Sequence, residues 1–199
     1  MLTERQERIL LSSKKFDYLT VKQFQCLHDL KSDRNAYRVI NQLEPYLNHF
    51  IDGDRKVFYL NKKGREVVDS NKIRRKLTSA THYLVRNDLY IHLGKPRTWQ
   101  NEVRMKYETS KEKIIVVADA HYTTKAYPHN KHHLIEIDNT QKMQKNKIKI
   151  EKYRRLIEKG VFKGMPKLIW VTTTPYRQET LKELCDGLDV MVYLTTDLK

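Results

Sequence analysis

The sequence predicts a mixed α/β protein in two parts. In residues 1–70, apolar side chains recur at helical spacing in three short segments, and two strand-like segments joined by a turn follow them. From residue 114 onward, strand-like and helical segments alternate, which is typical of an α/β domain with a mixed sheet. The chain of 199 residues is long enough for two small domains. We expect domains at 1–70 and 82–199, joined by a basic linker helix over 71–81.

Three helix starts are expected in the first part. Thr3 precedes the first helix, Thr20 the second and Ser32 the third, because Ser and Thr side chains accept hydrogen bonds from the free N–H groups of a helix start. The third helix is expected to begin after Ser32-Asp33 and to carry the apolar residues Tyr37, Ile40, Leu43 and Leu47. Three short helices with brief connections form the core of a helix-turn-helix domain.

A β-hairpin is expected directly after the third helix. Residues 49–51 and 57–60 are rich in aromatic and β-branched side chains, and Asp52-Gly53-Asp54-Arg55 between them is a turn sequence. A hairpin in this position is a wing, and a further helix is expected to begin near Asn61. Residues 1–70 are therefore predicted to form a winged helix-turn-helix domain.

The charge of the chain favours a polyanionic partner. There are 39 Lys and Arg residues against 24 Asp and Glu, giving a net charge of +15, and nucleic acid is the first candidate. No segment approaches the roughly 20 apolar residues of a membrane span, so no membrane partner is expected. The polar start lacks the apolar core of a signal peptide, and Cys26 and Cys185 are expected to be reduced. These features predict a cytoplasmic protein that binds double-stranded DNA.

The third helix and the wing supply the candidate DNA contacts. The third helix of such a domain enters the major groove, where Arg bonds guanine and Asn or Gln bonds adenine, while wing cations meet phosphate or the minor groove. The alternative is that these are ordinary exposed side chains, or that the domain docks a protein. The candidates are Arg34, Asn35, Arg38 and Gln42 on the helix, with Arg55 and Lys56 on the wing.

The second part is expected to begin with a helical segment that carries Leu84, Leu89 and Ile91, followed by four strands and two further helices. Its apolar runs change from helical spacing to short strand-like segments and back. Strands are expected at residues 114–118, 134–138, 167–172 and 190–194, and helices at 140–159 and 179–188.

Three acids in these strands form a candidate metal site. Asp119 closes the first strand, and Glu136 and Asp138 stand two apart on the next, which places both on one face. If the two strands pair as a hairpin, the three carboxylates converge, and carboxylates suit Mg²⁺ or Mn²⁺. Such a metal could activate water against a phosphodiester. The alternative is that the acids keep the sheet edge in contact with water.

Several of these segments carry a family resemblance. The segments are residues 82–90, Ala118-Asp119, residues 136–138 and residues 149–153. An acid after an apolar strand, then a strand with Glu-x-acid and a basic helix, resembles the PD-(D/E)XK nuclease fold. More narrowly, the chain resembles the replication-relaxation family of plasmid and mobile-element proteins. The resemblance implies a role in replication initiation or DNA transfer, with replication or transfer proteins and a possible homodimer as partners. It also implies that Glu102 matches an acid on or near the first core helix.

One departure from the nuclease pattern concerns its lysine. Asp138 stands where the lysine that orients the attacking water is expected, and Lys142 or Lys145 on the following helix is a candidate substitute. Three hypotheses follow: a DNA-binding protein with an inactive nuclease-like domain, an active Mg²⁺- or Mn²⁺-dependent endonuclease, or a transcription regulator that dimerises through its C-terminal domain.

Overall fold

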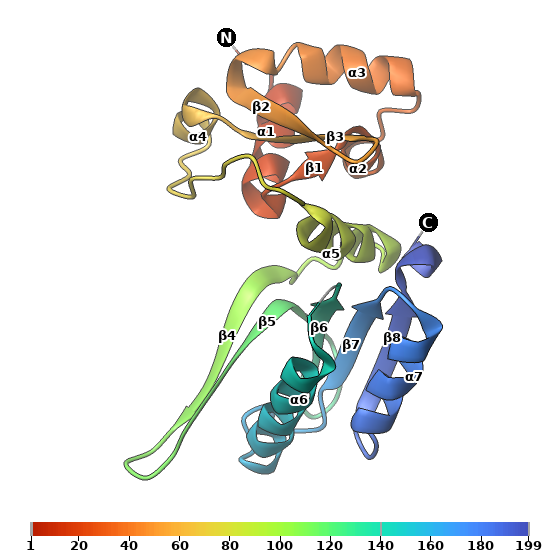
Figure 1. The fold of residues 1–199 in the computed structure, drawn as a ribbon. Coiled ribbons are helices and arrows are strands. Elements are labelled where there is room, and N and C mark those ends of the chain that lie inside the picture. Colours follow the sequence, from red (N-terminus) through yellow and green to blue (C-terminus); the bar gives the residue numbers. More distant parts are fainter. Residues whose placement is uncertain (1, 140, 199) are drawn as a thin grey trace. The chain divides into compact units, whose positions relative to one another are not determined.

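The computed structural model describes residues 2–139 and 141–198 (Figure 1). The chain divides into two compact units, Met1–Ile91 and His92–Lys199. Within the described residues, no helix is both long and apolar enough to cross a membrane.

The first unit has three α-helices followed by a β-hairpin, in the order that the sequence predicts. Its three-stranded antiparallel sheet has the order β1-β3-β2, and β2 and β3 form the predicted hairpin. Thr3 and Thr20 each accept a hydrogen bond from the third residue of their helix, as does Ser32. The elements are α1 (Glu4–Phe16), β1 (Leu19–Thr20), α2 (Val21–His28), α3 (Asp33–Asn41), β2 (Leu47–Asp52), β3 (Arg55–Leu60), α4 (Lys62–Val67) and α5 (Thr81–His92).

The third helix is shorter than expected. It ends at Asn41, and Leu47 is the first residue of β2 rather than part of the helix. Between them Glu44–Tyr46 forms one turn of 3₁₀ helix with Pro45 near its start. Proline has no N–H to donate and disfavours the helical conformation in the residue before it, which explains why the α-helix does not continue.

The expected linker helix over 71–81 is wrong, because residues 71–80 have no regular secondary structure. The buried carboxylate of Asp17 binds Arg74 of this segment at 2.9 Å and Arg86 of α5 at 3.2 Å. The backbone N–H of Ala80 donates to Asp52 at 2.9 Å. α5 therefore begins where the linker was expected to end, and most of it belongs to the first unit.

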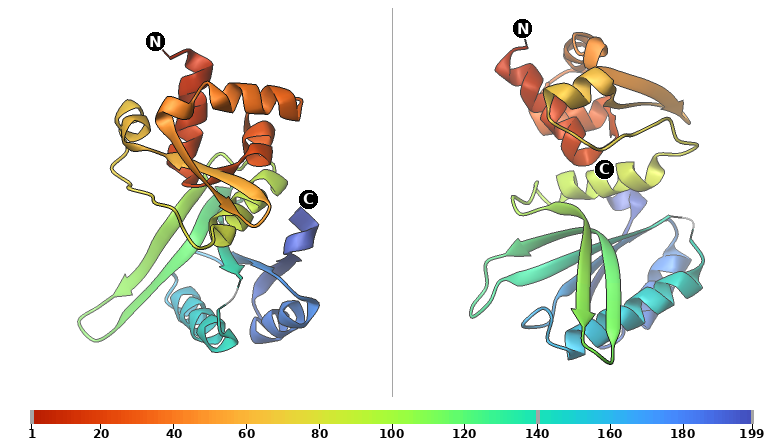
Figure 2. Two further views of the ribbon diagram at one scale, coloured as in Figure 1. Left: turned by 45° about the horizontal axis from the view of Figure 1, so that its top comes forward. Right: turned by 90° about the vertical axis from the view of Figure 1, so that its left-hand side faces the viewer.

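The second unit is the expected α/β domain with a mixed sheet. Its five strands have the order β4-β5-β6-β7-β8, with antiparallel pairing from β4 to β6 and parallel pairing from β6 to β8. Figures 1 and 2 show both long helices on the same face of this sheet. The elements are β4 (Gln100–Glu108), β5 (Lys113–Thr124), β6 (Lys131–Asp138), α6 (Met143–Glu158), β7 (Lys167–Thr172), α7 (Pro175–Leu184) and β8 (Asp189–Leu194).

The strand β4 was not predicted from the sequence. Its apolar side chains Val103, Met105 and Tyr107 alternate with charged ones, which is the pattern of a strand with one covered face. Glu102 consequently lies on a strand and not on a core helix, and its φ of 54° falls in the left-handed region. β4 and β5 continue as a ribbon beyond the other strands (Figure 2).

The core of the second unit fixes α6 over the middle of the sheet. Ile150, Tyr153 and Leu156 of α6 are buried together with Leu134 of β6 and Trp170 of β7. Because side chains three and four apart share one helix face, the same packing directs Asn146 and Lys149 of α6 toward the strands. This places polar groups of α6 above the acids of β6.

Candidate nucleic-acid interface and carboxylate site

The two faces of α3 differ in burial and in charge. Ala36, Val39 and Ile40 are buried, which holds the helix on the domain. The predicted contacts Arg34 and Arg38 are exposed on the other side. The Arg38 guanidinium donates to the Asn35 side-chain oxygen at 2.9 Å. Exposed guanidinium groups on a helix anchored by its apolar face can reach an external polyanion.

Asn35 and Gln42 differ in their availability. The Asn35 amide donates to the Leu30 carbonyl at 2.8 Å, so its N–H groups help to close the turn between α2 and α3. Gln42 is exposed just after the end of the helix. The geometry therefore gives Asn35 a positioning part in the turn and leaves Gln42 at the surface.

The two wing cations, Arg55 and Lys56, each interact with a neighbouring side chain. Arg55 lies 3.7 Å from the Asp52 carboxylate, and the Lys56 ammonium lies 5.2 Å from the centre of the Phe58 ring. Both side chains are half-buried. Gly53 at the tip has a φ of 64°, which a tight hairpin turn requires and which glycine adopts without steric cost.

In the second unit, Glu136 and Asp119 form a close pair of acids. Glu136 is buried, and its carboxylate accepts from the Tyr153 hydroxyl at 2.5 Å and contacts the Lys149 ammonium. Asp119 accepts from the backbone N–H of Ile137 at 2.7 Å. Burial, and after it the negative charge of Asp119, raises the pKa of Glu136 to about 8, although Lys149 and Tyr153 act to lower it. The hairpin thus brings two of the three predicted acids together.

Asp138 has a different environment from Glu136, two residues away on the same strand. Arg177 donates to both of its carboxylate oxygens, at 2.6 Å and 2.7 Å, and Asn146 and Thr172 donate at 2.8 Å and 2.7 Å. Burial acts to raise the pKa of Asp138, but these donors outweigh it and leave the pKa below its ordinary value. Four donors on one buried carboxylate identify Asp138 as the anchor of β7, α6 and α7.

The residues present do not fit the predicted three-carboxylate metal site. Within residues 2–139 and 141–198, no group of three or more His, Cys, Asp or Glu side chains is arranged to hold a metal ion. Asp138 already accepts hydrogen bonds on both oxygens, and Glu136 has a donor on each of its own. In the described residues the three acids therefore do not converge on one metal site as predicted, because Arg177 of α7 binds Asp138.

The lysine that faces the acids is Lys149, not the predicted Lys142 or Lys145. Lys142 precedes α6 and is exposed, as is Lys145 one turn later, whereas Lys149 contacts Glu136. Lys149 stands three residues after the buried Asn146 and four before the buried Tyr153. That helical spacing is a signal in the sequence that could have identified Lys149 as the lysine facing the acids.

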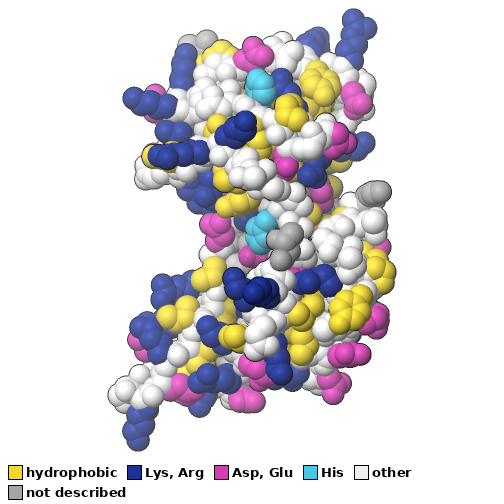
Figure 3. All heavy atoms as spheres, viewed as in Figure 1, with side chains coloured by type: hydrophobic (Ala, Val, Ile, Leu, Met, Phe, Trp, Pro, Cys, Tyr) yellow, Lys and Arg dark blue, Asp and Glu magenta, His cyan; other side chains and the backbone are white. Residues whose placement is uncertain are grey.

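The face of the second unit that carries α6 is rich in cations. Figure 3 shows Lys and Arg side chains gathered there among fewer acidic ones. We call the exposed lysines from residue 142 to residue 152 the α6 basic face: Lys142, Lys145, Lys147 and Lys152. Such a face attracts phosphate groups.

Three solved structures share low sequence identity with the chain. Protein VC1899 from Vibrio cholerae is 14% identical over 100% of this chain and 55% of that one, with a TM-score of 0.45. Restriction endonuclease FokI is 11% identical over 97% and 43%, with a TM-score of 0.39. FokI bound to DNA is 12% identical over 98% and 43%, with a TM-score of 0.29. The chain thus spans about half the length of these structures.

The family of the chain follows from a broader match. No curated protein matches the chain at a significant level. A family model described as replication-relaxation matches residues 10–172, which include α2, α3, the hairpin and the strands that carry Asp119 and Glu136. That range covers most of the chain and confirms the resemblance inferred from the sequence. The chain belongs to the replication-relaxation family.

Proposed function

We propose that this protein binds duplex DNA in the replication or relaxation of a plasmid or mobile element, with a nuclease-like domain that grips DNA without cutting it. The first unit supplies recognition through α3 and the wing, and the α6 basic face adds contacts to phosphates. The family supports the biological setting, since its description joins replication and relaxation.

The observation that carries this proposal is the state of the cations on α3. Arg34 is exposed and has no acidic partner among the described residues, and Arg38 bonds only to the neutral Asn35. Guanidinium groups that the protein has not neutralised are available to guanine edges or phosphates. The buried face formed by Ala36, Val39 and Ile40 keeps them on a rigid element.

The proposal that the protein does not cut DNA rests on the contacts of Glu136 and Asp138 in the second unit. Burial raises the pKa of Glu136, and Lys149 and Tyr153 donate to its two carboxylate oxygens, so both oxygens are already engaged by the protein. Asp138 is held by Arg177. The arrangement therefore favours a folded, DNA-binding domain over a metal-dependent enzyme.

A second candidate is a Mg²⁺- or Mn²⁺-dependent endonuclease. The observation that favours it is the grouping of Asp119, Glu136 and Lys149, which are the residue types of the nuclease pattern with the lysine supplied from α6. In that case the two acids would hold the metal and Lys149, not Lys142, would be the lysine near the phosphate.

A plasmid assay separates the two candidates. Supercoiled plasmid is incubated with wild-type protein and with Asp119→Ala and Lys149→Ala, in Mg²⁺, Mn²⁺ or EDTA, with the exposed Lys147→Ala as matched control. We expect every protein to retard the DNA and none to nick it. Metal-dependent nicking that is lost in Asp119→Ala and Lys149→Ala but kept in Lys147→Ala would overturn the non-cutting proposal in favour of the endonuclease.

A homodimer, and contacts with replication or transfer proteins, also belong to the proposal. The mobility of the protein–DNA complex in the same gels, compared with a complex of known mass, reports how many copies bind one site. A dimer would require two half-sites about one helical turn apart.

A further inference from the structure

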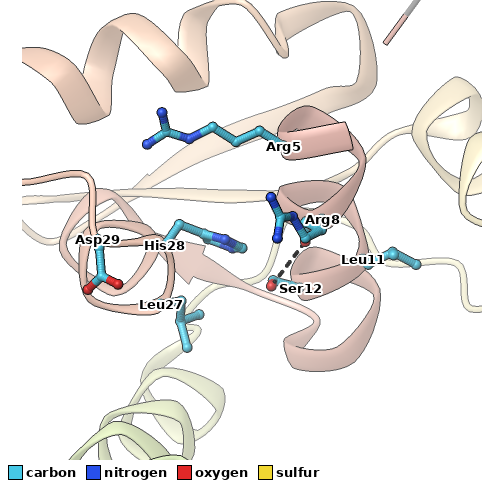
Figure 4. Close-up of a pocket in the computed structure, with 7 residues that line it drawn as sticks. All are labelled: Arg5, Arg8, Leu11, Ser12, Leu27, His28 and Asp29. Carbon is cyan, nitrogen blue, oxygen red and sulfur yellow. Dashed lines mark hydrogen bonds between the residues drawn. The ribbon is translucent and has the colours of Figure 1, made fainter. Parts of the chain in front are cut away.

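A hollow lies between α1 and α2 of the first unit (Figure 4). Its volume is about 700 Å³, within the range of small-molecule sites. The lining consists of Arg5, Arg8, Leu11 and Ser12 from α1 and Leu27, His28 and Asp29 from the end of α2. None of these residues is among the predicted DNA contacts on α3 or the wing.

Three nitrogen-bearing side chains converge on the hollow. Arg5 and Arg8 stand three residues apart on α1 and therefore share one side of that helix. Figure 4 shows both guanidinium groups and the His28 ring directed into the space between the two helices. Guanidinium groups are donors only and match the oxygens of phosphate in a fixed fork geometry.

The positive charges of Arg5 and Arg8 have little acidic compensation among the described residues. Arg5 makes no hydrogen bond or ion pair with any of the described residues, and Arg8 has only a long, exposed pair with Glu4 at 3.8 Å. An exposed pair of this kind contributes little. Asp29 is the acid of the lining, and Figure 4 shows its carboxylate turned away from both arginines.

The lining also includes two apolar side chains, one from each helix. Leu11 of α1 is 43% exposed and Leu27 of α2 is half-buried, and Figure 4 shows them apart from each other. Apolar side chains in a lining that also carries convergent cations suit a ligand with both a phosphate and an apolar or flat group. A nucleotide unit has this chemistry, either as a free nucleotide or as part of a nucleic-acid strand.

We propose that the hollow between α1 and α2 is a phosphate-binding site, in which Arg5 and Arg8 hold the phosphate oxygens and Leu11 and Leu27 contact the remainder of the ligand. The phosphate comes either from a free nucleotide or from the DNA backbone. Only the backbone source rests on the proposed function.

The first arm of the test uses free ligands. The thermal unfolding temperature of the full chain is measured against increasing pyrophosphate and ATP, both without metal, for wild type, the double variant Arg5→Gln/Arg8→Gln, and the control Lys22→Gln. Lys22 is an exposed cation of α2 outside the hollow. Ligand that binds only the folded state raises the unfolding temperature in proportion to ln(1 + [L]/Kd). A free-nucleotide site predicts a saturable rise in wild type and Lys22→Gln, with at least a tenfold weaker Kd in the double variant.

The second arm uses a labelled DNA duplex at several salt concentrations. A backbone-phosphate site predicts weaker binding by the double variant than by Lys22→Gln, together with a salt slope smaller by about one to two units, about one for each lost phosphate contact. An effect in either arm supports the site and identifies its source.

The inference is overturned if the double variant matches the control in both arms. If wild-type protein fails to bind DNA at all, the proposed function fails, and the free-ligand arm still decides the hollow. Since Arg5 and Arg8 are exposed, their substitution is expected to leave the fold intact, and the unfolding temperature without ligand verifies this.

Discussion

α3 and α6 both carry cations, but more of the cations of α6 form ion pairs or hydrogen bonds within the protein. On α3, Arg34 has no acidic partner among the described residues. On α6, Lys149 contacts Glu136, Arg154 donates to the carbonyls of Leu184 and Asp186 at 2.9 Å and 2.7 Å, and Arg155 lies 2.6 Å from Glu112. A run of basic residues in a sequence therefore overstates the charge that is available to DNA.

The largest effect is expected from removing the carboxylate that anchors α6. Asp138→Ala would leave the Arg177 guanidinium and the Asn146 amide without their acceptor, and breaking a buried pair in this way costs about 3–5 kcal/mol in the free energy of unfolding. Urea unfolding measures the change. The matched control is Glu151→Ala, which removes an exposed acid 3.7 Å from Arg154 and should cost less than about 1 kcal/mol. Equal losses in the two variants would mean that Asp138 is not a structural anchor.

The next effect concerns the available charges of α3. Arg34→Ala/Arg38→Ala is expected to weaken duplex binding at least tenfold, because an arginine that contacts a base or phosphate contributes about 1–3 kcal/mol. Fluorescence anisotropy with a labelled duplex measures the affinity. Arg154→Ala is the contrasting variant, since Arg154 is bonded to two carbonyls: it should lose stability but keep its affinity. An equal loss of affinity in both would remove the difference between the two helices.

A smaller effect should separate two lysines of α6 itself. Lys145 is exposed, so Lys145→Ala should weaken duplex binding a few-fold and lower the salt slope by about one unit. Lys149 is engaged by Glu136, so Lys149→Ala should leave the affinity within about twofold of wild type. Anisotropy titrations at several salt concentrations compare the two. The reverse order would mean that Lys149 leaves Glu136 to bind DNA.

The smallest effect is a pH dependence of stability in the unit that carries α6. Burial lowers the pKa of His121 to about 4, with contributions from the nearby His132 and His133. His121 therefore stays neutral in the folded protein while it takes up a proton in the unfolded chain below its ordinary pKa of about 6.5. The unfolded state binds more protons there, so stability should fall as the pH drops from 6.5 toward 4.

The check is urea unfolding at pH 7, 5.5 and 4.5. His121→Gln should lose part of the fall in stability, whereas His129→Gln, at an exposed position, should show the same fall as wild type. An unchanged pH profile in His121→Gln would contradict the assignment to His121.

Local signals in the sequence account for much of the fold. The capping residues Thr3, Thr20 and Ser32 and the turn at Gly53 act over a few residues, and each appears where it was expected. The proximity of Asp119 to Glu136 also follows from a local feature, the hairpin that pairs β5 with β6.

The features that the sequence did not reveal depend on distant partners. Arg177 reaches Asp138 from 39 residues away, because β7 pairs in parallel with β6 and α7 begins just after β7, near the end of β6 that carries Asp138. Asp17 pairs with Arg74 and with Arg86 of α5 across almost 60 and 70 residues of sequence. The basic segment that contains Arg74 was expected to be helical, and it has no regular secondary structure. Neither pairing has a local pattern, since an ion pair can join any two surfaces that the fold brings together.

The most direct test of DNA binding through α3 is the salt dependence of duplex affinity for wild type and for Arg34→Ala/Arg38→Ala. We predict that the logarithm of the wild-type association constant falls steeply and linearly with the logarithm of salt concentration, and that the double variant has both a lower affinity and a slope smaller by about one to two units. A wild-type affinity that is nearly independent of salt, or a double variant that matches wild type, would contradict it.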